Sequence, residues 1–151
     1  MEHYSTDDVA KIIGLPRRKL LAFVERGYVR ASIQEASGHG SRRLWSHNDV
    51  IRCAVVSIAL PLLSVNGIRA LADTLKRDTN VQVDKYWLVP IDGGPPEVVT
   101  RDVELDSDRM PTGPPLAAIV LDETTMRTAM AVVIDFARVH AAVDAGTAKL
   151  K

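Results

Sequence analysis

Three consecutive cations, Arg17, Arg18 and Lys19, stand at the start of a predicted helix. The amino-terminal end of a helix carries partial positive charge, so each cation there costs on the order of 0.3 kcal/mol. An arrangement that is locally unfavourable is typical of a functional site. The same side chains can bind DNA phosphates or the edge of a guanine. We therefore expect an anionic partner, with a solvated basic turn as the alternative.

A second basic group follows in the segment from Gly38 to Arg43, which reads Gly-His-Gly-Ser-Arg-Arg. Its glycines permit close approach of the backbone to a ligand, and the guanidinium groups of Arg42 and Arg43 are suited to phosphate. Together with the predicted helix that starts with Arg17, Arg18 and Lys19, this segment is predicted to hold a DNA duplex at two points. A flexible surface loop that happens to contain arginines is the alternative.

Two short helices are predicted to position the first basic group. Ser5 can cap the first helix, which has Asp8 three residues further on and is expected to end at Gly14. The second helix is predicted over residues 17–26 and is expected to end at Gly27. Two short helices joined by a glycine-containing turn form a helix-turn-helix, whose second helix commonly enters the major groove.

A β-hairpin is predicted to position the second basic group. Its strands are expected at residues 28–33 and 43–45, with the glycine-containing loop between them. Trp45, at the end of the hairpin, is expected to pack on the first helix rather than to stack on a DNA base. Two further helices are predicted to follow Ser46 and Ser64, because each serine can cap a helix.

These segments resemble the winged helix-turn-helix of MerR-type transcription regulators over roughly residues 3–77, and residues 32–44 are similar to a MerR-like subgroup common in high-GC bacteria. The resemblance rests on Tyr4-Ser5-Thr6, Val9-Ala10, Gly14, Leu20, Phe23, Gly27-Tyr28-Val29, Arg42-Arg43-Leu44-Trp45-Ser46 and Asp49-Val50. It implies sequence-specific binding of double-stranded DNA, usually by a dimer on a palindromic site, with the second helix in the major groove and the wing on the flanking backbone. The residues that we expect to contact DNA are Arg17, Arg18, Lys19, Leu21, Tyr28, His39, Ser41, Arg42 and Arg43.

The chain departs from the MerR pattern in several respects, including Ala22 and Val24 at positions that are usually aromatic and acidic. Leu21 stands where the family usually has arginine, so the base contacts are expected to differ, for example by contact with a thymine methyl group. Pro16 replaces a serine that commonly caps the second helix. The long coiled-coil helix of many family members is not expected after Lys76. Because Cys53 is the single cysteine, the chain has no cysteine cluster of the metal-sensing kind, and we expect neither a metal nor another cofactor.

The second half of the chain has a different pattern, which predicts a small unit of three strands and one helix. We expect strands at residues 81–91, 97–105 and 116–121 and a helix at residues 123–145. The predicted fold class is therefore α+β, with a winged helix-turn-helix domain at residues 1–78 and a small α+β dimerisation or effector domain at residues 79–151.

The predicted final helix is apolar on more than one side. One row of apolar residues comprises Met126, Met130, Val133, Ile134, Ala137 and Ala141, and further apolar residues are Val132, Phe136, Val139 and Val143. Such a helix must be covered on more than one side. We expect it to pack on the sheet and to pair with the same helix of a second copy, giving a homodimer. Any small-molecule or protein effector is expected to bind this half.

The 151 residues include 19 Lys and Arg against 19 Asp and Glu. Residues 1–57 hold nine basic against six acidic residues and residues 80–151 hold seven against eleven, so the first half is the one that favours an anionic partner. We expect a cytoplasmic, nucleoid-associated protein that has no signal peptide or membrane partner. Acidic residues 102–108 are interpreted as a solvated surface, with a divalent-cation site as the alternative.

No arrangement of residues typical of catalysis is found in the sequence, so we do not expect an enzyme. The sequence favours a transcription regulator that binds double-stranded DNA as a homodimer. The main alternative is an excisionase-like architectural or adaptor protein whose acidic half recruits a protein partner. An enzyme that carries a DNA-binding module is a third alternative.

Overall fold

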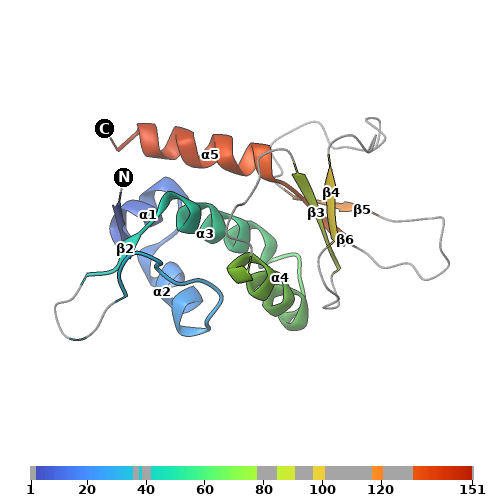
Figure 1. Cartoon of the computed structure of the whole chain (residues 1–151), viewed down its shortest axis with the longest axis horizontal. Coiled ribbons are helices and arrows are strands. Elements are labelled where there is room, and N and C mark those ends of the chain that lie inside the picture. Colours follow the sequence, from blue (N-terminus) through green and yellow to red (C-terminus); the bar gives the residue numbers. More distant parts are fainter. Residues whose placement is uncertain are drawn as a thin grey trace.

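The computed structural model describes residues 3–35, 38, 42–77, 85–90, 97–100, 117–120 and 131–150, and these residues form an α+β fold (Figure 1). Helices dominate the first half of the chain, and a four-stranded antiparallel sheet followed by a helix makes up the described second half. In chain order the elements are β1 (Tyr4–Ser5), α1 (Thr6–Ile12), α2 (Arg17–Glu25), β2 (Leu44–Trp45), α3 (His47–Ala59), α4 (Val65–Arg77), β3 (Lys85–Pro90), β4 (Glu97–Thr100), β5 (Ala117–Val120), β6 (Ala131–Asp135) and α5 (Phe136–Ala148).

The two predicted short helices are confirmed, and their ends follow the sequence signals. The Ser5 hydroxyl accepts a hydrogen bond from the Asp8 backbone N–H at 3.2 Å, and the Asp8 carboxylate accepts one from the Ser5 backbone N–H at 3.0 Å. This reciprocal pair satisfies two amides that the first turn of α1 leaves free. Gly14, with φ +65°, and Gly27, with φ +72°, adopt the left-handed conformation that glycine tolerates best, and they lie just beyond α1 and α2.

The predicted hairpin strand at residues 28–33 is wrong. Strand β2 pairs with β1 instead, in an antiparallel register that places Tyr4 opposite Trp45. The expected hairpin pairing is reduced to one bridge between Gln34 and Leu44, with backbone hydrogen bonds of 3.2 and 3.0 Å. The physical reason is burial: Tyr28, Val29 and Ala31 belong to the core, where their side chains pack without a neighbouring strand.

Helices α3 and α4 follow the two predicted serine caps. The Ser46 hydroxyl accepts from the Asp49 backbone N–H at 3.2 Å, and the Ser64 hydroxyl accepts from the Gly67 backbone N–H at 3.1 Å. Trp45 is fully buried and its indole N–H donates to the Thr6 hydroxyl at 3.2 Å. Since Thr6 begins α1, the expected packing of this tryptophan on the first helix is confirmed.

The second sheet has the strand order β4-β3-β6-β5, and all neighbouring strands are antiparallel. The predicted helix at residues 123–145 is wrong over residues 131–135, because Ala131–Asp135 is a central strand and α5 starts at Phe136. Three consecutive β-branched residues, 132–134, favour a strand. The Asp135 carboxylate then accepts from the Ala137 backbone N–H at 3.0 Å and caps the helix. Residues 121–130 lie outside the described part.

Helix α5 lies alongside α1 and α3, with the four-stranded sheet beyond its first turn (Figure 1). Phe136, Val139 and Val143 are its buried residues, whereas Ala141, expected on the buried row, is exposed. These three side chains belong to the same apolar core as the helices of the first half. Within the described residues, no helix combines the length and apolar character needed to cross a membrane.

Candidate nucleic-acid interface

Arginines from two separate segments line one surface hollow of about 330 Å³. We call this the arginine hollow, and its lining residues are Ser5, Thr6, Asp7, Arg17, Arg42 and Arg43. Arg17 is the first residue of α2, and Arg42 and Arg43 directly precede β2. The structure therefore brings together one member of the first basic group and two of the second.

Pairing of β1 with β2 is what brings these segments together. Because Ser5 lies opposite Leu44, the start of α1 is placed beside the residues that precede β2. The buried hydrogen bond from Trp45 to Thr6 fixes the same contact. The glycine-ended turn then returns the chain so that α2 begins near the start of α1, and Arg17 lies within reach of Asp7.

Ion pairs occupy two of the three arginines. The Arg17 Nε lies 2.9 Å from the Asp7 Oδ1, with both side chains about two-thirds exposed, at 63% and 65%. The Arg43 Nε lies 3.6 Å from the Glu35 Oε2. Arg42 is exposed and pairs with no carboxylate that the structure describes. Exposed ion pairs contribute roughly 0–1 kcal/mol, so an incoming phosphate can replace the exposed Arg17–Asp7 pair at small cost.

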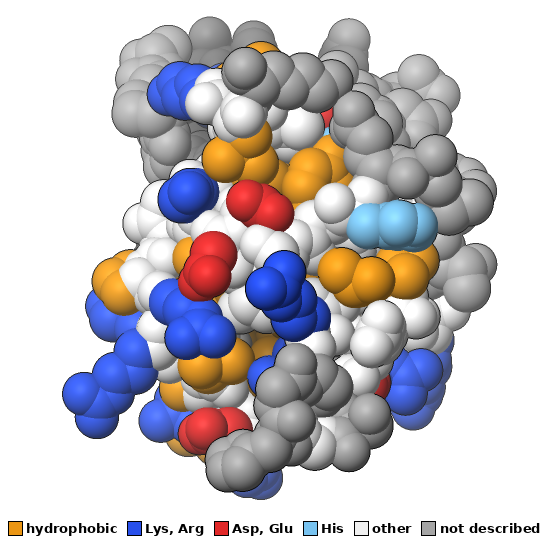
Figure 2. Space-filling view, turned by 90° about the vertical axis from the view of Figure 1, so that its left-hand side faces the viewer, with side chains coloured by type: hydrophobic (Ala, Val, Ile, Leu, Met, Phe, Trp, Pro, Cys, Tyr) orange, Lys and Arg blue, Asp and Glu red, His pale blue; other side chains and the backbone are white. Residues whose placement is uncertain are grey.

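A second carboxylate beside the hollow is held in its ionised form. The hydrogen bonds that Ser5 donates from its hydroxyl and its backbone N–H keep the pKa of Asp8 below its ordinary value. Asp7, which lines the hollow, pairs with Arg17, so the positive charge of this surface is partly balanced. Figure 2 shows the face of the molecule that is at the left-hand side of Figure 1. Lys and Arg side chains are spread over this face, with Asp and Glu side chains among them.

The remaining predicted contact residues are dispersed. Arg18 and Lys19 are exposed on the first turn of α2, and Leu21 is half-buried. Tyr28 is 8% exposed and belongs to the core. His39 and Ser41 lie outside the described residues.

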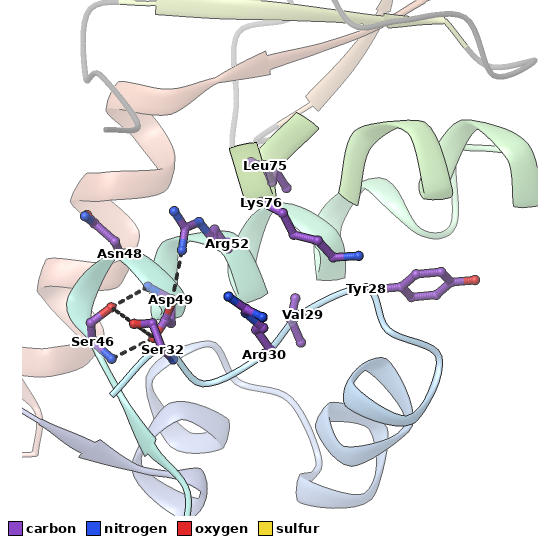
Figure 3. A pocket seen from close by; sticks show the side chains of 10 residues that line it. All are labelled: Tyr28, Val29, Arg30, Ser32, Ser46, Asn48, Asp49, Arg52, Leu75 and Lys76. Atoms are coloured by element: carbon purple, nitrogen blue, oxygen red, sulfur yellow. Dashed lines mark hydrogen bonds and ion pairs between the residues drawn. The ribbon is translucent and has the colours of Figure 1, made fainter. Parts of the chain in front are cut away.

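Sequence reasoning missed a buried carboxylate that supports this region. Asp49, only 1% exposed, accepts hydrogen bonds from the Ser32 backbone N–H at 2.8 Å, the Ser32 hydroxyl at 2.6 Å and the Ser46 backbone N–H at 2.9 Å. The Arg52 guanidinium donates to its other oxygen at 3.1 Å (Figure 3). Asp49 thus joins the segment after α2 to the start of α3. The capping pattern predicted only the Ser46 contact, because Ser32 becomes a neighbour through the fold alone.

The described residues contain no group of three or more His, Cys, Asp or Glu side chains that could hold a metal ion. Cys53 is fully buried on α3, and burial raises the pKa of its thiol, so it behaves as a small apolar side chain. In the comparisons with known proteins, no family profile matches the chain and no curated protein is significantly similar to it.

Proposed function

We propose that the chain binds double-stranded DNA through the arginine hollow and the exposed first turn of α2, as a winged helix-turn-helix transcription regulator. The observation that carries the proposal is the convergence of Arg17, Arg42 and Arg43 on one surface, from segments that the sequence separates widely. Guanidinium groups bind phosphate oxygens in bidentate geometry and are the usual contacts of such proteins to the DNA backbone.

The charge distribution of α2 also supports a DNA partner. Its first turn carries Arg17, Arg18 and Lys19 and no acidic residue, and Pro16 gives it no side-chain cap. The positive end of the helix dipole repels these three cations, and the negative charge of a polyanion would offset that repulsion. We infer that α2 lies in the major groove, with Leu21 as an apolar contact and Arg42 and Arg43 on the flanking backbone.

A dimeric assembly completes the proposal, since helix-turn-helix proteins commonly read two half-sites with two copies. The second half of the chain is the proposed dimerisation unit. Sedimentation velocity on the full chain measures the mass directly: a dimer is expected, and a monomer at concentrations that saturate DNA would contradict this part of the proposal.

The DNA proposal is tested by selecting bound fragments from sheared bacterial genomic DNA and measuring their affinity by fluorescence anisotropy over a range of salt concentrations. Arg42→Gln is expected to weaken all duplexes and to reduce the salt slope by about 1, as for the loss of one phosphate contact. Arg17→Gln is expected to relax sequence preference. Arg77→Gln removes the same charge at the exposed end of α4 and serves as the control, with little change.

Two outcomes would contradict the proposal. One is the absence of binding to any fragment at low salt. The other is an equal loss of affinity in the Arg42 and Arg77 variants, since this would indicate a diffuse charge effect. Footprinting adds a further distinction, because one or two discrete half-sites support a regulator, whereas phased sites along the duplex indicate an architectural protein.

A further inference from the structure

A second hollow, of about 300 Å³, lies between the segment at residues 28–32, the start of α3 and the end of α4 (Figure 3). We call it the α3–α4 hollow. Its volume is at the lower end of the range of small-molecule sites, about 300–1,000 Å³. None of the arginine hollow residues lines it, so it is a separate feature of the surface.

The charges of the α3–α4 hollow leave two cations available. Among the described residues that line the hollow, Asp49 is the one carboxylate, and Arg52 pairs with it at 3.1 Å. Arg30 is exposed and forms no ion pair with any described residue. Lys76 lies 3.2 Å from Asp73, in an exposed pair within α4. Such a pair is weak, so its ammonium group remains available to a ligand.

The two available cations approach the hollow from opposite walls. Figure 3 shows the side chains of Arg30 and Lys76 extending into the space between the 28–32 segment and α4. The Ser46 hydroxyl and the Asn48 amide add neutral polar groups at the start of α3. Val29 and Leu75, from the same two walls as the cations, are buried at 5% and 1% exposed and add little apolar surface. The combination of two cations and neutral polar groups in a concave space suits a small molecule that carries a phosphate group.

We propose that the α3–α4 hollow binds a small phosphorylated molecule, with Arg30 and Lys76 contacting its phosphate oxygens. A bound phosphate would join the segment that leads into the proposed wing to the end of α4, from which the chain continues to the second half. Because the hollow is concave, it fits a small molecule better than the extended backbone of a duplex. A free small molecule is therefore the occupant that these features favour over a DNA phosphate.

The test is isothermal titration calorimetry of the full chain with inorganic pyrophosphate, in the absence of DNA. Saturable binding of one pyrophosphate per chain is expected. Arg30→Gln and Lys76→Gln are each expected to weaken it by about tenfold, as for the loss of one charge-assisted hydrogen bond. Arg69→Gln, which removes an exposed cation from the same helix α4 outside the hollow, should leave the affinity unchanged.

The proposal is overturned if pyrophosphate does not saturate, or if the Arg69 variant weakens binding as much as the other two. A second arm adds a DNA duplex to the pyrophosphate-bound protein. Simultaneous binding is expected; displacement of pyrophosphate, together with weaker duplex binding by the Arg30 and Lys76 variants, would assign the hollow to a DNA phosphate and refute the small-molecule proposal. The melting temperature of each variant, measured by circular dichroism, shows that it is folded. Because the first arm contains no DNA, its result is independent of the proposed function.

Discussion

Gly146 permits a close approach between α5 and the end of α1. A Cβ atom at this position would lie 2.5 Å from the Ile12 carbonyl oxygen, 2.9 Å from its Cγ2 and 3.0 Å from its Cα. Two of these three are backbone atoms at the end of α1, so they move only if the helices separate. We therefore expect Gly146→Ala to push α5 away from α1.

The sign of the change in the free energy of unfolding distinguishes the effect of this contact from the effect of helix propensity. In a solvent-exposed helix, replacing glycine by alanine raises the free energy of unfolding by about 1 kcal/mol. Overpacking against a rigid neighbour costs about 1–3 kcal/mol. Because the obstructing atoms belong to the backbone, we take the upper part of that range and expect a net loss of about 2 kcal/mol.

Urea unfolding followed by circular dichroism measures the change. Ala145→Gly, at the adjacent exposed position of α5, calibrates the propensity effect near this helix end and should cost at most about 1 kcal/mol. If Gly146→Ala proves neutral or stabilising while Ala145→Gly is destabilising, α5 does not pack on α1 as the structure has it, and the argument is refuted.

Three further results are expected. Asp49→Asn should lower the free energy of unfolding by about 3 kcal/mol or more, because a buried charge pair loses one partner, whereas Asp73→Asn in an exposed pair should cost at most about 1 kcal/mol; equal effects in urea unfolding would contradict this. Ser5→Ala should cost about 1 kcal/mol at neutral pH. The folded pKa of Asp8 lies below its ordinary value of 3.8, so the stabilisation that the Ser5–Asp8 hydrogen bonds give is present above pH 3.8 and is lost as the pH falls through the folded pKa. The free energies of unfolding of wild type and Ser5→Ala should therefore converge in acid, and a difference that does not narrow would contradict this prediction. Cys53, whose thiol pKa burial raises, should react with a thiol reagent only at the rate of unfolding, and fast labelling of native protein would show that it is accessible.

Local signals in the sequence predicted where helices start and end in the first half of the chain. The serine caps at Ser5 and Ser46 and the glycines at positions 14 and 27 act within a few residues, so neighbouring residue types suffice to identify them. The alternation and β-branched content of the second half likewise predicted three strands, and the described residues of these three ranges form β3, β4 and β5.

The sequence did not predict which strands pair. Residues 131–135 were interpreted as part of a helix, because apolar residues at helical spacing continue through them. They form a strand because β3 and β5 lie on either side and complete their backbone hydrogen bonds. In the same way, the two residues of β1 carry no strand pattern, and β2 pairs with them because the fold brings them together.

The candidate sites were likewise predicted from the sequence only in part. The residue types alone indicated that Arg17, Arg42 and Arg43 are suited to an anion, since a run of cations at a helix start and beside a glycine-containing loop is visible in the sequence. Their convergence on one hollow, the anchoring of Ser32 by Asp49 and the approach of α5 to α1 depend on contacts between residues far apart in the chain. Residue chemistry is a local property, whereas distances between remote residues are fixed only when the core packs.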